Sequence, residues 1–309
     1  MKRKSSNSTN FIVKAKISKI ENISDVIINV INSKILNKNI LKLLEYLKFH
    51  FESTCNAQLP NDLVVTFIES LCQSTNDTQY HLLLIFHQLI KQKSISNGEI
   101  LIQSISIVVD RFIFFSDENQ RKLISIFRLL LKKYPQSSII NNSKIITTLY
   151  QKVNNDPVNI DYLIDSTKFV RYIIDHSLGQ LLEINAILFL NKVIQTNNLQ
   201  IIENAIIALS RLILISEHFL DLLMSTNTCS VILGQIPYDC PRVTVLGLKI
   251  IKLISTGKQI HLQSIIDSNQ LPQLIRRILI QNIAIELNET LFLVSNLIEC
   301  DQIQLKFLI

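Results

Sequence analysis

The sequence is short of the residues that break helices and of several that carry chemistry. Its 309 residues include 5 glycines, 6 prolines, 2 methionines and no tryptophan. So few glycines and prolines leave little material for the turns that separate strands. They also leave almost none for a loop that cradles phosphate, and neither GxGxxG nor GxxxxGK[ST] occurs. These absences favour an all-α fold and argue against a nucleotide-binding enzyme.

Groups that catalyse reactions or bind metals are scattered along the chain. The six histidines lie in separate segments, except for His81 and His87, whose spacing of six residues places them on different faces of a predicted helix. The cysteines are odd in number, and no CxxC or Cys/His spacing occurs. We therefore expect buried, reduced thiols rather than disulfides or a zinc site, and no enzymatic activity, cofactor, metal or small-molecule substrate. The five cysteines are Cys55, Cys72, Cys229, Cys240 and Cys300.

Charge and hydropathy limit the classes of partner. The formal net charge is +6, but the lysines and arginines are spread out and form no basic helix with interleaved aromatics. A nucleic-acid partner is therefore not expected. Mean hydropathy is +0.29, yet no apolar run reaches the roughly 18–20 residues that span a bilayer. The polar, basic start of the chain lacks the apolar core of a signal peptide, so we expect a soluble intracellular protein without membrane insertion.

Apolar residues recur with helical spacing from Ile23 onward. Segments such as 39–51, 78–92 and 117–133 place them at i, i+3, i+4 and i+7, which predicts amphipathic helices. Residues 1–20 lack this pattern and read as a basic, disordered tail. The sequence thus predicts two parts, a tail at 1–20 and a helical array at 21–309.

A helical phrase recurs along the array at nearly constant intervals. If one comparable position is marked in each copy, the successive steps are 42, 41, 42, 39, 41 and 44 residues. Repeats of about 40–47 residues built from two or three helices are typical of armadillo and HEAT solenoids, in which each repeat packs on its neighbours. We therefore predict a right-handed armadillo-type α-solenoid of about seven repeats. The marked positions are Leu43, Ile85, Ile126, Lys168, Ile207, Leu248 and Phe292.

The C-terminal third resolves into three helices per repeat, which favours armadillo over two-helix HEAT repeats. The predicted helices are 217–226, 227–236 and 240–255, followed by 258–267, 270–279 and 283–299. Gly257 is expected to end a third helix in a left-handed turn. Residues 302–309 read as a first helix without a second or third, which predicts either a truncated relative of a longer array or a final helix that folds back.

Residues 183–309 resemble the importin-α (karyopherin-α) family. The segments GLKIIKLISTGKQIHLQSIIDSNQLPQLIRRIL (247–279) and ELNETLFLVSNLIECDQIQLKFLI (286–309) carry the resemblance. It implies a concave groove, lined by third helices, that holds an extended nuclear localisation signal. In that family a Trp-x-x-x-Asn pair on each third helix packs along Lys or Arg stems and hydrogen-bonds the peptide backbone, which agrees with the physics of cation–π contact and stem packing.

Transferred to this chain, the resemblance implies four peptide-binding pairs. Only the last keeps an aromatic ring with an amide, and Arg211 and Lys252 place positive charge where a basic signal needs acceptors. At the three preceding marked helices the equivalent pairs are apolar (Leu43/Leu47, Ile85/Leu89 and Ile126/Leu130), and we expect these to be core. The four candidate pairs are Lys168/Tyr172, Ile207/Arg211, Leu248/Lys252 and Phe292/Asn296.

The resemblance predicts an importin-α-like nuclear import adaptor, in cytoplasm and nucleus, that binds cargo through its nuclear localisation signal. Importin-β is a further candidate partner, although residues 1–20 contain only six basic side chains where the family has a long basic segment. Two alternatives remain open. One is an armadillo scaffold with no transport role, and the other is a HEAT-type subunit of a larger complex.

Overall fold

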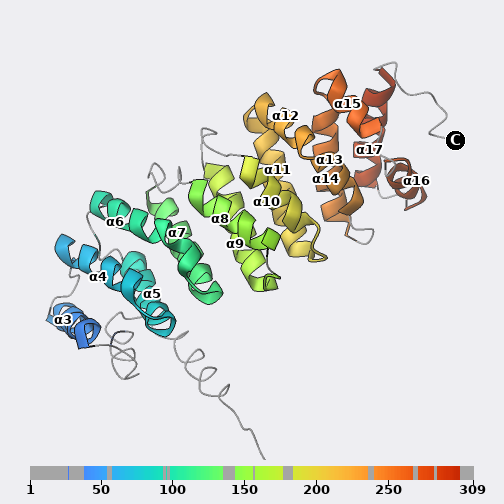
Figure 1. Cartoon of the computed structure of the whole chain (residues 1–309). Helices are drawn as coiled ribbons and strands as arrows, with labels where there is room; N and C mark the ends of the chain where they lie inside the picture. Colours follow the sequence, from blue (N-terminus) through green and yellow to red (C-terminus); the bar gives the residue numbers. More distant parts are fainter. Residues whose placement is uncertain are drawn as a thin grey trace, which may run out of the picture. The chain divides into compact units, whose positions relative to one another are not determined.

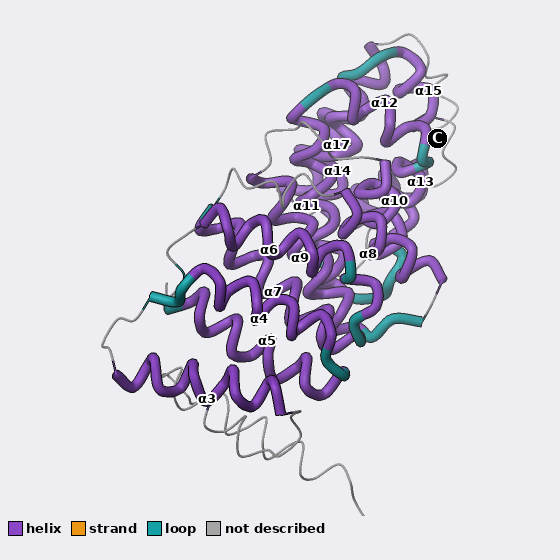
Figure 2. Tube along the Cα trace, turned by 60° about the vertical axis from the view of Figure 1, so that its left-hand side comes forward, coloured by secondary structure: helices purple, strands orange, loops and turns teal. Residues whose placement is uncertain are grey.

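In the computed structural model, the described residues form a series of helices (Figure 1). The structure describes residues 38–53, 58–92, 98–134, 143–155, 157–176, 184–235, 240–266, 271–281 and 284–299, together with Ile27 and Ile95. The predicted tail at 1–20 and the predicted last helix at 302–309 lie outside these residues, as do Cys55 and Cys300. Within the described part of the chain, Figure 2 shows helices and loops and no strand.

The chain divides into two compact units, Met1–Ile139 and Ile140–Ile309. In the first unit, α4 packs on α5 and α6, and α5 packs on α7. A short 3-10 turn lies between α6 and α7. The elements of this unit are α3 (Lys38–Ser53), α4 (Asn61–Gln73), α5 (Asn76–Lys91), α6 (Gly98–Asp110), η1 (Phe112–Phe114) and α7 (Asp117–Lys133).

The second unit is built in the same way from more helices. Its α9, α11, α14 and α17 form one row of neighbours, and α8, α10 and α13 form another. The elements are α8 (Ser143–Asn155), α9 (Ile160–His176), α10 (Ile184–Ile194), α11 (Leu199–Ile215), α12 (Glu217–Ser225), α13 (Thr228–Gln235), α14 (Pro241–Ser255), α15 (Gln259–Ile266), α16 (Leu271–Gln281) and α17 (Ala284–Glu299).

The predicted three-helix unit appears in the last two repeats. Helices α12–α14 and α15–α17 match the predicted segments to within two residues at each end. In the four preceding repeats the described residues form helix pairs, such as α4 with α5 and α10 with α11. The first helix of an armadillo repeat is therefore seen here only between 217 and 299.

Local sequence sets where several helices begin. Ser116 caps α7 by accepting a hydrogen bond from the Asn119 N–H at 3.4 Å. Asn198 caps α11 by accepting from the N–H groups of Gln200 and Ile201 at 3.1 and 3.2 Å. Pro241 opens α14, where its missing N–H costs no helical hydrogen bond. Such caps satisfy backbone donors that the first helical turn leaves without partners.

Within each unit, burial of apolar side chains between neighbouring helices stabilises the fold. In α11, for example, Ile201, Ala205, Leu209 and Leu212 are completely buried on one stripe. Each fully buried Leu or Ile contributes roughly 1.5–3 kcal/mol of transfer free energy, so a repeat is stabilised mainly by contacts with its neighbours. None of the described helices combines the length and the apolar composition needed to cross a membrane.

Candidate functional site

The row α9, α11, α14 and α17 exposes one stripe of each helix along its length. Helix α11 packs against α9 and α14, and α14 packs against α17. We call the exposed and half-buried residues of these four helices the third-helix face. At a rotation of 100° per residue, the centre of the exposed stripe falls at Lys168, Ile207, Lys249 and Phe292.

The four predicted peptide-binding residues of α9 and α11 all lie on this face. Lys168, Tyr172 and Ile207 are half-buried, and Arg211 is exposed. The Tyr172 ring stacks on the His176 imidazole with centroids 4.0 Å apart. The register of these two helices therefore agrees with the sequence prediction.

On α14 the predicted register is wrong by one residue. Leu248 is completely buried, so it belongs to the core and cannot contact a bound peptide. The exposed stripe of α14 runs instead through Arg242, Lys249 and Leu253. Lys252 lies at the edge of this stripe with 31% of its side chain exposed.

Ion pairs join the helices of the third-helix face, and their cations lie further out than their carboxylates. Arg211 of α11 pairs with Asp175 of α9, with side chains 61% and 28% exposed. Arg242 of α14 pairs with Glu203 of α11 at 2.8 Å, with side chains 75% and 26% exposed. In addition, the Arg171 guanidinium donates to the Asn204 Oδ1 at 2.8 Å. In both ion pairs the guanidinium is therefore the more exposed of the two charged groups.

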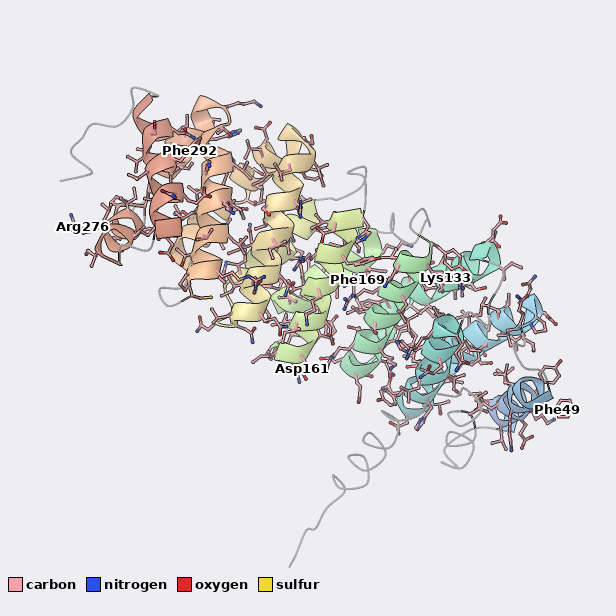
Figure 3. All side chains as sticks on the ribbon, turned by 180° about the vertical axis from the view of Figure 1, so that it is seen from behind. Phe49, Lys133, Asp161, Phe169, Arg276 and Phe292 are labelled. Carbon is pink, nitrogen blue, oxygen red and sulfur yellow. The ribbon has the colours of Figure 1, made fainter. Side chains whose placement is uncertain are left out.

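Phe292 (labelled in Figure 3) and Asn296 of α17 both contact residues near the C-terminal end of α14. The Lys252 Nζ lies 3.7 Å from the centroid of the Phe292 ring and 3.3 Å from the Glu289 Oε2. The Asn296 amide donates to the Ser255 Oγ at 2.9 Å. The aromatic and the amide proposed to read a peptide thus make contacts within the chain itself.

In the first unit, the apolar pairs expected to be core are confirmed as core. Ile85, Leu89, Ile126 and Leu130 are completely buried. Leu43 and Leu47 of α3 are buried as well, at 9% and 0% exposure.

The half-buried residues of α5 and α7 form a cationic surface that the sequence did not single out. Burial lowers the pKa of Lys122. Burial, together with the charges of Lys122 and Lys91, lowers the pKa of His87 to about 4. The Arg128 Nε is buried and has no hydrogen-bond partner within the described residues. Cationic groups here are thus desolvated, and no carboxylate contributes to the pKa shifts of His87 and Lys122.

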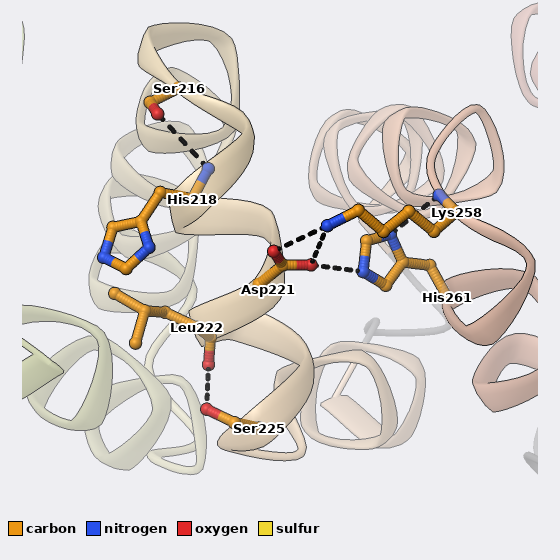
Figure 4. A network of polar contacts seen from close by, with 7 residues as sticks. All are labelled: Ser216, His218, Asp221, Leu222, Ser225, Lys258 and His261. Atoms are coloured by element: carbon orange, nitrogen blue, oxygen red, sulfur yellow. Dashed lines mark hydrogen bonds and ion pairs between the residues drawn. The ribbon is translucent and has the colours of Figure 1, made fainter.

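A polar network links the first helices of the last two repeats (Figure 4). Asp221 of α12 accepts from the Lys258 Nζ at 2.9 Å and from the His261 Nε2 at 2.9 Å. The Lys258 backbone N–H donates to the His261 Nδ1 at 3.1 Å, so the neutral imidazole carries its proton on Nε2. The hydrogen bonds from Lys258 and His261 lower the pKa of Asp221.

This network also explains why residue 257 is a glycine. Gly257 does not adopt the predicted left-handed conformation, so that expectation is wrong. A Cβ at this position would collide with the His261 ring and come within 2.7 Å of Leu220 Cδ2. Close approach of the two repeats, rather than a C-cap turn, requires the missing side chain.

The described residues contain no group of three His, Cys, Asp or Glu side chains placed to hold a metal ion. Cys72, Cys229 and Cys240 are free thiols, and burial raises the pKa of the Cys229 thiol to about 12. A thiol with so high a pKa carries almost no thiolate at neutral pH and is a poor nucleophile.

Comparison of the sequence with protein-family models and with curated proteins finds no match. Solved structures of the same fold do match. A designed armadillo repeat protein, YIII(Dq)4CqI, aligns with a TM-score of 0.53 at 13% identity. The alignment covers 76% of this chain and 99% of the designed protein. An engineered protein has a TM-score of 0.55 at 10% identity, covering 77% of this chain and 97% of its own. The fold is thus an all-α solenoid of the armadillo type.

Proposed function

We propose that this chain is a protein-interaction scaffold whose third-helix face binds an extended, acidic segment of a partner protein. The armadillo-type fold supports a binding role because stacked repeats present a long surface that can follow an extended chain. The chemistry of the partner is inferred from the residues of the face and not from the fold.

The outward position of the cations is the observation that carries the proposal. Arg211 and Arg242 are much more exposed than the carboxylates that pair with them. Lys249 is exposed at the centre of α14. A segment with spaced Asp or Glu side chains would add a second carboxylate to these exposed guanidinium and ammonium groups, which retain free donors.

A narrower proposal is an importin-α-like import adaptor that moves between cytoplasm and nucleus and binds a basic localisation signal. It is supported by the resemblance of residues 183–309 and by Phe292 and Asn296, which lie one turn apart on α17. Cargo with such a signal, and importin-β, would then be the partners. The two proposals require opposite charge in the bound segment, so one measurement separates them.

That measurement is fluorescence anisotropy with two labelled twelve-residue peptides that carry Glu or Lys at every second position. We expect the purified chain to prefer the Glu peptide and its affinity to fall with added salt, because exposed charges are screened. Preference for the Lys peptide, together with direct binding of purified importin-β, would favour the adaptor. Equal binding of both peptides would contradict a charge-selective face.

Single substitutions can show that the third-helix face is the surface used. We expect Arg211→Ser and Arg242→Ser each to lower the affinity for the Glu peptide several-fold, since a charge-assisted contact at an exposed site contributes roughly 0.5–1 kcal/mol. Arg276→Ser is the matched control, because Arg276 is also exposed but lies on α16, outside the face (Figure 3). A loss with Arg276→Ser as large as with the other two would show that net charge alone governs binding.

A further inference from the structure

Lys252 lies in a small site that has the features of a receptor for a cationic side chain. The Lys252 ammonium is 3.7 Å from the Phe292 ring centroid, and the Glu289 Oε2 lies 3.3 Å from the same ammonium nitrogen. Two other lysines, Lys133 and Lys152, lie over aromatic rings at longer distances of 5.1 and 5.3 Å. An aromatic face and a carboxylate that converge on one ammonium ion are the elements by which proteins bind lysine and arginine side chains.

The neighbouring contacts fix this arrangement. The Glu289 and Phe292 side chains project from one side of α17, three residues apart, so both can reach the same group on α14. One turn further, Asn296 donates to the Ser255 Oγ at 2.9 Å, and Ser255 in turn donates to the Lys252 carbonyl at 2.7 Å. Helices α14 and α17 are thus joined by two sets of contacts, one at Lys252 and one at Ser255. Both sets engage side chains of α17 that could otherwise contact a partner.

We propose that Lys252 is a built-in occupant of this cation site and the residue that excludes lysine and arginine side chains from the third-helix face. Its own ammonium fills the place between Phe292 and Glu289, so a second cation would meet repulsion without a ring or carboxylate to offset it. Removal of the Lys252 side chain vacates the site, which then accepts an ammonium or guanidinium group from a peptide. This inference refines the proposed function by naming the determinant of charge selectivity on the same face.

The test compares Lys252→Ala with wild type in binding the labelled Lys peptide. We expect an affinity gain of about tenfold, the size of one cation–π contact combined with an ion pair at a half-buried site. Lys249→Ala is the matched control, since it removes one positive charge from an adjacent exposed position of α14. The double variant Lys252→Ala/Phe292→Leu should lose part of this gain, because the ring is removed and the Glu289 carboxylate remains.

The outcomes separate the possible explanations. An equal gain in Lys252→Ala and Lys249→Ala would mean that lowered net charge is sufficient, and would overturn the proposal. No gain in a Lys252→Ala protein that unfolds cooperatively at a temperature near the wild-type value would also overturn it. Binding of the Glu peptide by wild type is read separately and tests the proposed function, so failure of either idea can be recognised by itself.

A spectroscopic measurement tests the internal contact without any peptide. In protein with ¹³C-labelled lysine, the ring current of Phe292 should shift the ε-protons of Lys252 upfield from those of other lysines. The shift should disappear in Phe292→Leu and persist in Asn296→Ala. A Lys252 resonance at the position of exposed lysines in wild type would show that the ammonium does not occupy the site.

Discussion

Cationic side chains on the third helices have different surroundings in the two units. On α11 and α14 of the second unit, cations such as Arg211, Arg242 and Lys252 each have a carboxylate on a neighbouring helix. On α5 and α7 of the first unit, His87 and Lys122 are half-buried. Burial lowers the pKa of both groups, and the charges of Lys122 and Lys91 lower the pKa of His87 further.

The difference separates two uses of a charged surface. A cation paired across helices is screened by its own partner and contributes to the contact between repeats. A cation that is desolvated without a carboxylate carries an electrostatic cost, which lowers its pKa and weakens the folded state as pH falls. The two surfaces should therefore respond differently to substitution and to acid.

The largest expected effects on stability come from variants that distinguish a buried residue from its exposed or half-buried neighbour on the same helix. Leu248→Ala should lower the free energy of unfolding by about 2–5 kcal/mol, since it leaves a cavity in a fully buried site. Lys249→Ala, one residue on, should change it by less than about 0.5 kcal/mol. Ile126→Ala and Ser125→Ala form the same contrast on α7. The measurement is urea unfolding followed by circular dichroism, and similar losses within either pair would contradict the assigned register.

The same pair of residues shows how far the sequence could predict the site. The step of about 41 residues placed each marked position inside a helix of the structure, because the repeat length and the helix pattern are encoded locally. It could not fix the rotation of each helix. In 246–254 apolar residues stand on both sides of Lys249, since α14 contacts α11, α13, α15 and α17, and the buried stripe is correspondingly wide. A wide stripe leaves the exposed position uncertain by one residue, which is the error at Leu248.

Contacts between repeats were beyond the sequence for a different reason. Asp221 meets Lys258 and His261, and Lys252 meets Glu289 and Phe292, at separations of 37 to 40 residues. Each partner alone reads as an ordinary surface or core residue. Only the packing of one repeat on the next places them together, so the occupied cation site and the reason for Gly257 had no local signal.

A smaller effect is expected from acid on the first unit. The pKa of His87 in the folded chain, about 4, lies below its ordinary 6.5, so the unfolded chain binds more protons between these values. Stability is then complete above about pH 6.5 and falls as pH drops towards 4. The full shift corresponds to about 3 kcal/mol for a buried group, and partial exposure of His87 reduces this to roughly 1 kcal/mol.

Variants of His87 and its neighbour identify the source of this loss. His87→Gln should flatten the stability profile between pH 6.5 and 4, and Lys122→Met should reduce the slope by removing one repelling charge. His218→Gln, at an exposed position of α12, serves as the control for loss of an imidazole. Urea unfolding at several pH values gives the profile, and an unchanged slope in His87→Gln would show that His87 is not the source of the acid-dependent loss.

The smallest effect is expected at Asp221, where the charges are paired. Hydrogen bonds from Lys258 and then His261 hold the pKa of Asp221 below its ordinary 3.8. A carboxyl group of this kind stabilises the folded state above the unfolded value, and the contribution is lost as pH falls through the lowered folded value. Asp221→Asn should therefore leave the profile between pH 6.5 and 4 parallel to wild type and make it shallower only below about pH 4. Since Asp221 is exposed, the change should be small and should shrink further at high salt. If Asp221→Asn instead altered the slope above pH 4, the loss of stability in that range would not belong to His87 alone, and the contrast between the two units would not hold.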